Sequence, residues 1–361
     1  MSISSSSGSP TPEPQQPPHS LAAAFPALPI AQENPWLAPL AGYSDLPFRL
    51  LTREFGAQVV CSEMVSAKGL YYKSPGTEEL LATTADDGPM VLQLFGNDAD
   101  IMARAMEPLL ETGYTWFDLN MGCSVRKVVK TGCGAAMLCD IDNALRVART
   151  MVRLAGEGRV GFKFRLGWDQ DTEVYSDLAQ QLRDAGAGWV TLHPRYARQG
   201  FSGEARWSAL AHLVQLLDIP VIASGDLLHA EDGVRCIQQT NVAAVMFARG
   251  ALNNPAIFEE FTSLMRGEEF LRPDPRKTMR VLQRHVELAR LHSTDKRALF
   301  RMRSLVPRYI KLFPGARHMR NQLTECVSWE MLDTLLAECF ARWEQEGGNG
   351  EAQYIHPPQR D

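Results

Sequence analysis

Several features that would fix a location or a metal site are missing from this sequence. No run of about 18 apolar residues free of charge occurs, so none of the 361 residues offers a membrane-spanning helix. The seven cysteines are scattered at positions 61, 123, 133, 139, 236, 326 and 339, with no Cys-x-x-Cys pair and no histidine at a ligand spacing. This pattern disfavours structural zinc and a disulfide framework. No Lys or Arg precedes Arg49, so the positive start of a secretory signal is absent and we expect a cytoplasmic protein without a metal.

Charge is distributed unevenly, although the net charge is only −5. Between Arg276 and Arg320 the chain has thirteen Lys or Arg against Glu287 and Asp295, a local net charge of 13 − 2 = +11. Residues 321–361 reverse this balance, with eight acids against two arginines. A concentrated basic segment predicts a polyanionic partner. A solvated helical face is the alternative interpretation.

Composition divides the chain into four parts. Residues 1–33 are rich in Ser and Pro and are predicted to be a disordered leader. Residues 34–265 alternate between strand-like and helix-like segments, whereas residues 275–346 have apolar residues at helical spacing only. We therefore predict a catalytic domain followed by a smaller helical domain, with residues 347–361 as a flexible tail.

Eight short apolar runs bounded by turn residues predict buried strands in the first domain. They cover residues 36–41, 58–65, 89–96, 116–122, 160–165, 189–193, 220–223 and 243–247, and no strand is expected after about Phe258. Asp45 and Asp98 are predicted to cap the helices that follow the first and third runs. Eight strand-helix units predict an α/β fold of the (β/α)8 TIM-barrel type. A doubly wound open sheet is the alternative, but no Gly-x-Gly-x-x-Gly follows the first run.

Residues suited to catalysis follow these runs. Cys123 comes directly after Gly122, which places its thiol at the carboxyl end of the fourth strand, on the catalytic face of such a barrel. Gln93, Asn120, Lys163 and His193 also stand at strand ends. Cys133 and Cys139 are rival thiols on the same connection. Because Cys133 lies between two glycines in a turn-like setting, we interpret it as inert.

Two loops have the composition of a phosphate site. Ser224-Gly225-Asp226 and Ala248-Arg249-Gly250 follow the seventh and eighth strands, where barrels commonly bind phosphate. Their small residues let backbone N–H groups approach an anion, and Arg249 adds a cation. Simple turn chemistry is the alternative explanation.

Seven motifs together resemble one enzyme family. They begin at Ala38 (APLAGYSDLPFR), Gln93 (QLFG), Asp118 (DLNMGC), Lys163 (KFRLGW), His193 (HPR), Ser224 (SGD) and Ala248 (ARGAL). In this order and spacing they are similar to the tRNA-dihydrouridine synthases over roughly residues 34–325, most of all to the bacterial B-type branch. The resemblance implies an FMN-bound barrel with a helical domain that holds tRNA. It also implies reduction of the C5–C6 bond of uridine with NADPH or NADH.

The resemblance assigns roles to residues of this chain. Cys123 would give a proton to C5 while a hydride from flavin N5 reaches C6. The cofactor would contact Ala38, Pro39, Leu40, Gln93, Asn120, Lys163, His193, Ser224, Gly225, Asp226, Ala248 and Arg249. RNA would contact Asn120, Lys127 and Arg195 near the pocket and Arg303, Arg308 and Lys311 in the helical domain. A cation at Lys163 would stabilise the negative charge of a reduced flavin.

Three positions depart from the family pattern. Ser124 stands where the family has proline, Ser224 where it has asparagine, and Ala248 where it has glycine. These changes spare the backbone donors but bear on how firmly the cofactor is held. Alternative functions are a synthase acting on ribosomal RNA, a flavin enzyme acting on a free pyrimidine, and an RNA-binding protein without catalysis. We expect a monomer.

Overall fold

The computed structural model describes residues 27–271, 275–293, 295–311, 313, 315–345 and 354–355. Most of the predicted leader and most of the predicted tail therefore lie outside the described residues. No helix among the residues described is both long and apolar enough to cross a membrane.

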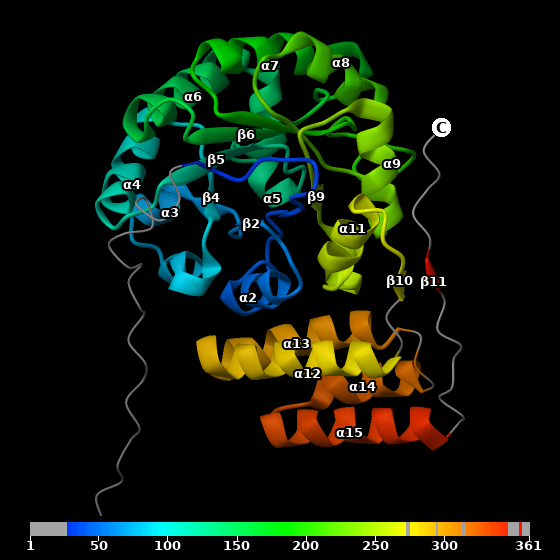
Figure 1. Cartoon of the computed structure of the whole chain (residues 1–361). Coiled ribbons are helices and arrows are strands. Elements are labelled where there is room, and N and C mark those ends of the chain that lie inside the picture. The colour runs from blue at the N-terminus through cyan, green and yellow to red at the C-terminus, as the bar shows by residue number, and fades with distance from the viewer. Residues whose placement is uncertain are drawn as a thin grey trace, which may run out of the picture.

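A closed parallel barrel forms the larger part of the molecule (Figure 1). Its strands are β1 (Trp36–Leu37), β2 (Val59–Cys61), β4 (Met90–Phe95), β5 (Trp116–Met121), β6 (Val160–Arg165), β7 (Trp189–His193), β8 (Val221–Ala223) and β9 (Ala244–Phe247). Each strand pairs in parallel with the next, and β1 pairs with both β2 and β9, which closes the ring. The predicted TIM barrel is confirmed.

The second strand differs from the prediction, which made residues 58–65 one continuous strand. Instead β2 is followed by β3 (Val65–Ser66), and both pair with β4. Cys61 lies opposite Val91, and Val65 lies opposite Leu94. Between these two pairs the chain advances by four residues from β2 to β3 but by only three residues along β4. One extra residue in a strand is a β-bulge, which bends the strand and breaks its ladder.

The first strand is also shorter than the predicted residues 36–41. The ladder continues one residue beyond β1, where the Ala38 N–H donates to the Phe247 carbonyl at 2.9 Å. Pro39 follows and has no N–H to donate, so regular pairing ends there.

Helices follow the barrel strands, and most of them surround the barrel on its outer face. They are α2 (Leu46–Glu54), α3 (Ala67–Tyr71), α4 (Ala99–Glu111), α5 (Arg126–Val129), α6 (Ile141–Ala155), α7 (Tyr175–Asp184), α8 (Ser208–Leu216), α9 (Ala230–Thr240), α10 (Arg249–Asn253) and α11 (Ile257–Met265). Short 3-10 turns lie at η1 (Glu78–Leu81), η2 (Ala85–Asp87), η3 (Gly134–Cys139) and η4 (Gln170–Thr172). Both predicted caps are confirmed, because Asp45 accepts from the N–H of Phe48 at 3.3 Å and Asp98 from those of Asp100 and Ile101 at 3.0 Å.

The inside of the barrel changes from apolar to polar along its axis. Trp36, Trp116 and Trp189 belong to a buried apolar cluster inside the ring, and the rings of Trp36 and Trp189 are 5.8 Å apart. Gly161 makes room for them, since a Cβ there would stand 2.0 Å from the Trp189 ring. Side chains alternate faces along a strand, so Asp118 and Asn120 share the inner face with Trp116 and lie nearer the carboxyl end.

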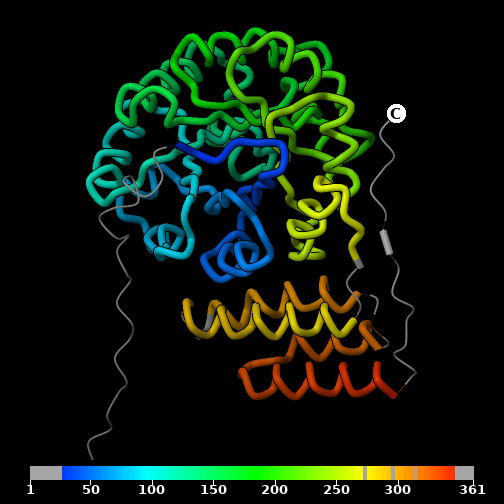
Figure 2. The backbone as a smooth tube through the Cα atoms, viewed as in Figure 1, coloured from blue at the N-terminus to red at the C-terminus, as the bar shows by residue number. Residues whose placement is uncertain are grey.

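A layer of four helices lies beneath the barrel in the view of Figure 1, and Figure 2 shows the same separation along the backbone trace. The layer consists of α12 (Pro275–His292), α13 (Asp295–Tyr309), α14 (Ala316–Glu325) and α15 (Trp329–Gln345). The helices α12 and α13 are nearest the barrel, and α12 packs against α2.

A short strand pair corrects the prediction that strands stop after about Phe258. Here β10 (Phe270–Leu271) pairs antiparallel with β11 (Tyr354–Ile355). Two-residue strands are too short to show the alternation on which a sequence prediction depends.

The basic segment of the sequence meets acids that lie outside it in the chain. Its ion pairs across to the barrel join Lys277 to Glu259, Arg284 to Glu54, Arg297 to Glu79, and Arg301 to both Asp45 and Glu63. Arg290 pairs with Asp333 of α15 at 2.7 Å. Much of the local charge of +11 is therefore balanced within the fold and serves to dock the helical layer.

Candidate active site

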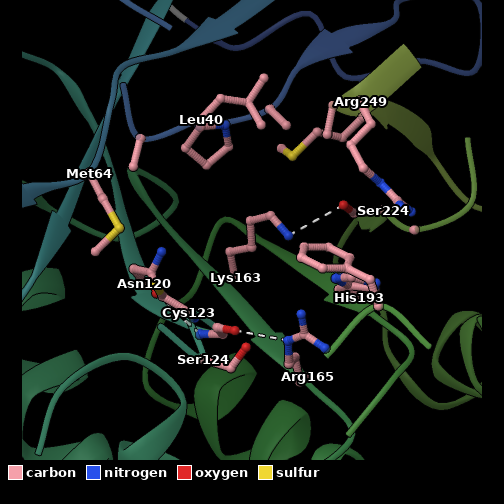
Figure 3. Close-up of a pocket in the computed structure, with 18 of the residues that line it drawn as sticks. Leu40, Met64, Asn120, Cys123, Ser124, Lys163, Arg165, His193, Ser224 and Arg249 are labelled. Carbon is pink, nitrogen blue, oxygen red and sulfur yellow. Dashed lines mark hydrogen bonds between the residues drawn. The ribbon is translucent and has the colours of Figure 1, made fainter. Parts of the chain in front are cut away.

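A cavity of about 230 Å³ opens at the carboxyl ends of the barrel strands (Figure 3). The predicted site residues that line it are Ala38, Pro39, Leu40, Asn120, Cys123, Lys163, His193, Ser224, Gly225, Asp226, Ala248 and Arg249. They come from strands and loops spread over more than 200 residues of sequence, yet they face one space. Most of the site residues predicted from the sequence therefore line one common cavity.

The remaining predicted residues lie elsewhere. Gln93 is buried beneath the cavity surface, and Arg195 is buried with its guanidinium bound to Asp226. Lys127 is exposed on α5, just beyond Cys123. Arg303 donates to the Thr324 carbonyl, whereas Arg308 lies over the ring of Tyr43 at 5.0 Å and donates to its hydroxyl at 3.2 Å. Lys311 is exposed after α13.

The loop that carries Cys123 is held by Asn120. The Asn120 Oδ1 accepts from the N–H of Gly122 at 3.2 Å and from that of Cys123 at 3.0 Å. On the other side, the Cys123 carbonyl accepts from the N–H of Ala135 at 2.9 Å. The thiol is partly exposed at the cavity, whereas Cys133 is buried outside it and Cys139 lies exposed on the outer surface. Of the three thiols considered, only Cys123 reaches the cavity.

Lys163 extends into the cavity from β6, and its Nζ donates to the Ser224 hydroxyl at 3.3 Å (Figure 3). Burial lowers the pKa of Lys163, and the nearby Asp118 carboxylate opposes that shift. In the same way burial raises the pKa of Asp118, opposed by a hydrogen bond from Gln93 and by the charge of Lys163. The two groups thus favour each other's charged form inside the barrel.

His193 is surrounded by cations. Burial is the main reason that its pKa lies far below the ordinary value, and Arg165, Lys163, Arg195 and Arg249 add to the shift. The imidazole is therefore neutral near pH 7. Its Nε2 faces Nη1 of Arg195 at 3.3 Å, so in the neutral ring this nitrogen accepts.

Arg165 is a site residue that the sequence reasoning did not single out. It donates to the carbonyl of Gly122 at 2.9 Å and to that of Gly200 at 2.8 Å, which ties the Cys123 loop to the loop after β7. Burial and the charge of Arg195 lower its pKa to about 10. One signal was available, because Arg165 is two residues after Lys163 and must share its face of the strand.

The two predicted phosphate loops meet at Asp226. This residue has a left-handed φ of +57°, and its carboxylate accepts from Arg195 at 2.7 Å, from the N–H of Ala205 at 2.7 Å and from Arg249 at 3.3 Å. The Asp226 side chain therefore orients Arg249 and does not itself face an anion. Gly225 beside it has a φ of +109°, and a Cβ there would stand 2.7 Å from Cδ2 of His193. Only glycine fits this position.

Apolar residues at the mouth were also missed. Met64, Val125, Phe201 and Leu228 line the cavity, and Phe201 is 61% exposed. The guanidinium of Arg249 lies 4.8 Å from the Phe201 ring centre and that of Arg165 lies 5.6 Å from it. Such residues carry no recognisable pattern in a single sequence. In the described part of the chain, no group of three or more His, Cys, Asp or Glu side chains is arranged to hold a metal ion.

Comparison with known proteins gives a consistent result. Residues 36–343 match the family model described as dihydrouridine synthase (Dus). A probable tRNA-dihydrouridine synthase 1 from Synechocystis sp. is 35% identical over 306 residues, which cover 84% of this chain and 85% of the relative. A tRNA-dihydrouridine synthase B from Pseudomonas aeruginosa is 32% identical over 317 residues, which cover 88% of this chain and 95% of the relative.

Proposed function

The chain belongs to the dihydrouridine synthase family, and on this basis we propose that it reduces the C5–C6 bond of uridine in tRNA to 5,6-dihydrouridine, with FMN as cofactor and NADPH as electron donor. The observation that carries the proposal is the meeting of Cys123, Asn120 and Lys163 in one cavity at the carboxyl end of the barrel. In this cavity a thiol could supply a proton, a carboxamide could hydrogen-bond to a uracil, and a buried cation could stabilise a reduced flavin.

The residues present fit a flavin. The Ser224 N–H is used by the Leu192 carbonyl, so the backbone N–H groups of Gly225 and Asp226, the Ser224 hydroxyl and the Arg249 cation would hold the phosphate. Glycine at position 225 lets this loop pack directly against His193, because a Cβ would stand 2.7 Å from the imidazole ring. When bound and reduced by NADPH, the flavin would supply the hydride for C6 of the uracil.

Lys163 would face the pyrimidine part of the flavin. Its amine sits between Ser224 and the charge of Asp118, inside the barrel. A cation in such a site stabilises negative charge far better than one in water. Asn120 would remain beside it, with one amide hydrogen free for the cofactor or the uracil.

Cys123 would deliver the proton to C5. A thiol held beside the reacting ring is able to act as a general acid. Its loop is fixed by Asn120 on one side and by Arg165 through Gly122 on the other. The apolar side chains of Leu40, Met64 and Phe201 would exclude water from the reacting ring.

RNA would approach the face that holds the cavity mouth. Lys127 is exposed next to Cys123 and is placed to meet a phosphate beside the target nucleotide. Arg303, Arg308 and Lys311 would extend this contact along the helical layer. A stacked uridine must leave its stack to enter the cavity, which costs roughly a few kcal/mol. Phosphate contacts on these cations would offset that cost.

A direct assay tests this function. Purified protein with NADPH is given unmodified tRNA, ribosomal RNA or free uridine, and dihydrouridine is measured by mass spectrometry together with the flavin absorbance. We expect yellow protein and product from tRNA alone. Product from ribosomal RNA or free uridine instead would select one of the alternative substrates, and a folded, flavin-loaded protein that yields no dihydrouridine from any of them would refute the proposal.

A further inference from the structure

A row of three side chains links the barrel interior to the Cys123 loop. Gln93 Nε2 donates to Asp118 Oδ2 at 2.7 Å, and Asn120 Nδ2 donates to Gln93 Oε1 at 2.8 Å. All three residues are buried, and Gln93 lies directly opposite Asp118 in the pairing of β4 with β5. We call Asp118, Gln93 and Asn120 the amide row.

The donor and acceptor of each hydrogen bond in the amide row follow from the orientation of Asn120, which lies at the outer end of the row. The N–H groups of Gly122 and Cys123 only donate, so Asn120 must turn its Oδ1 toward them. Its Nδ2 then faces Gln93, which has to offer Oε1. This leaves the Gln93 Nε2 as a donor that needs an acceptor, deep inside the barrel. Asp118 is the acceptor that it finds.

We propose that Asp118 is a positioning residue for Cys123, acting through Gln93 and Asn120 as the terminal acceptor of the amide row. Without that acceptor, the Gln93 amide has a buried donor with no partner, which is costly and favours a shift of the Gln93 side chain toward another acceptor. A shifted Gln93 no longer accepts from Asn120, and Asn120 then holds the two N–H groups of the loop less firmly. The thiol would no longer be held at the cavity, although no atom that touches it was changed.

The functional meaning of this positioning rests on the proposed role of Cys123 as proton donor. The hydrogen bonds of the amide row do not depend on that role. A competing interpretation is that Asp118 acts only as the counter-charge of Lys163, which its pKa also reflects. The two interpretations differ for Asp118→Asn. Asparagine keeps an oxygen acceptor for Gln93 but has no charge, whereas Asp118→Leu removes both.

The experiment measures how fast iodoacetamide alkylates Cys123 in the full-length protein, with flavin content recorded for each variant. Cys139 is the exposed thiol, and the five cysteines other than Cys123 and Cys139 are buried, so a Cys139→Ser background isolates Cys123. We expect Asp118→Leu to raise the rate about threefold or more, in keeping with coupling between contacting residues, and Asp118→Asn to stay close to the parent. Thr191→Val is the matched control, because Thr191 is buried inside the same barrel and its hydroxyl has no hydrogen-bond partner in the described structure.

A double-mutant cycle separates positioning from general damage. In an Asn120→Ala background the row is already broken, so Asp118→Leu should add nothing to the alkylation rate. If Asp118→Leu does not fold, Gln93→Met breaks the middle of the row and should give the same threefold rise and the same lack of additivity. An unchanged rate, an equal effect in both backgrounds, or an equal effect of Asp118→Asn and Asp118→Leu would overturn the proposal. Absence of dihydrouridine formation in the parent would refute the proposed function and leave the alkylation result standing.

Discussion

The guanidinium of Arg301 on α13 lies 2.8 Å from a carboxylate oxygen of Glu63, in the bulge between β2 and β3. The other oxygen of Glu63 accepts the N–H of Gly42, and Ala41 and Met64, the neighbours of these two residues, line the cavity. The helical layer thus reaches the cavity rim through one ion pair. A second bond from Arg301 to Asp45, the cap of α2, widens the contact.

Removing this contact should destabilise the protein measurably. Arg301→Met leaves Glu63 and Asp45, both mostly buried, without their cation, and we expect a decrease of about 1–3 kcal/mol in the free energy of unfolding. Arg290→Met is the control, because its pair with Asp333 is exposed and should contribute less than about 1 kcal/mol. Urea denaturation of both variants measures the difference, and equal decreases would contradict the special place of Arg301.

Acid should weaken the fold through His285. This residue is buried between α12 and its neighbours, with Nδ1 2.9 Å from the Tyr309 hydroxyl, and burial lowers its pKa to about 4. The unfolded chain, with a pKa near 6.5, then binds more protons than the folded one, so stability is full above about pH 6.5 and falls as the pH drops toward 4. Between pH 7 and pH 5 we expect this histidine to account for a loss on the order of 1–2 kcal/mol.

The variant His285→Gln should lose that part of the pH dependence while keeping a polar group near Tyr309. Unfolding free energies at pH 7 and pH 5, measured for both proteins, provide the comparison. If the variant and the parent weaken by the same amount, His285 is not the group responsible.

The thiol assignment predicts a split between the two halves of the reaction. Cys123→Ala should lower dihydrouridine formation by about 10²-fold or more, the usual contribution of a general acid, while NADPH oxidation continues. Cys133→Ala and Cys139→Ala should remain active, because neither thiol lines the cavity. An active Cys123→Ala variant together with an inactive Cys133→Ala variant would move the donor role to Cys133.

Flavin binding should depend on Gly225. In Gly225→Ala the new Cβ would press on His193 at 2.7 Å, and the φ of +109° adds strain, so we expect a large loss of bound flavin. Gly267→Ala is the matched control, since Gly267 has a φ of +77° but nothing within 4 Å of its Cβ position. Flavin absorbance per chain distinguishes the two, and full flavin content in Gly225→Ala would argue against a cofactor at this loop.

RNA affinity should respond to charge on the helical layer. Reversing Arg303, Arg308 and Lys311 together should reduce the slope of log K against log salt by about one unit for each RNA phosphate that these cations no longer neutralise. Arg153→Glu on the outer face of α6 serves as the control for net charge, because Arg153 is exposed on the barrel's helical ring. Binding of tRNA at several salt concentrations gives both slopes. An unaltered slope in the triple variant, with its fold intact, would remove these residues from the RNA surface.

Sequence patterns located the cavity because barrel topology brings strand ends together. Asn120, Lys163 and His193 stand at the ends of three adjacent strands, so the fold alone made them neighbours. The hydrogen bond between Gln93 and Asp118 was beyond reach, since the strand ends do not reveal which way a side chain turns. Phe201 belongs to a loop with no periodicity, so nothing in the sequence predicts that it lies beside two arginines at the cavity.

The charge pattern also shows what a sequence alone does not predict. A run of cations in sequence predicted an anionic partner, but Arg284, Arg297 and Arg301 find carboxylates more than 200 residues away. Net charge along a segment says nothing about acids that folding brings against it. The residues left for RNA are correspondingly fewer than the sequence implied.

The three tryptophan side chains inside the barrel bear on the order in which reactants enter the cavity. Trp36, Trp116 and Trp189 fill the amino end of the ring, so the cavity is reached from the carboxyl end, where Phe201 and Leu228 stand. Under the proposed function, an electron donor and a uridine would both enter from this end of the described barrel. We therefore expect one of them to leave before the other binds.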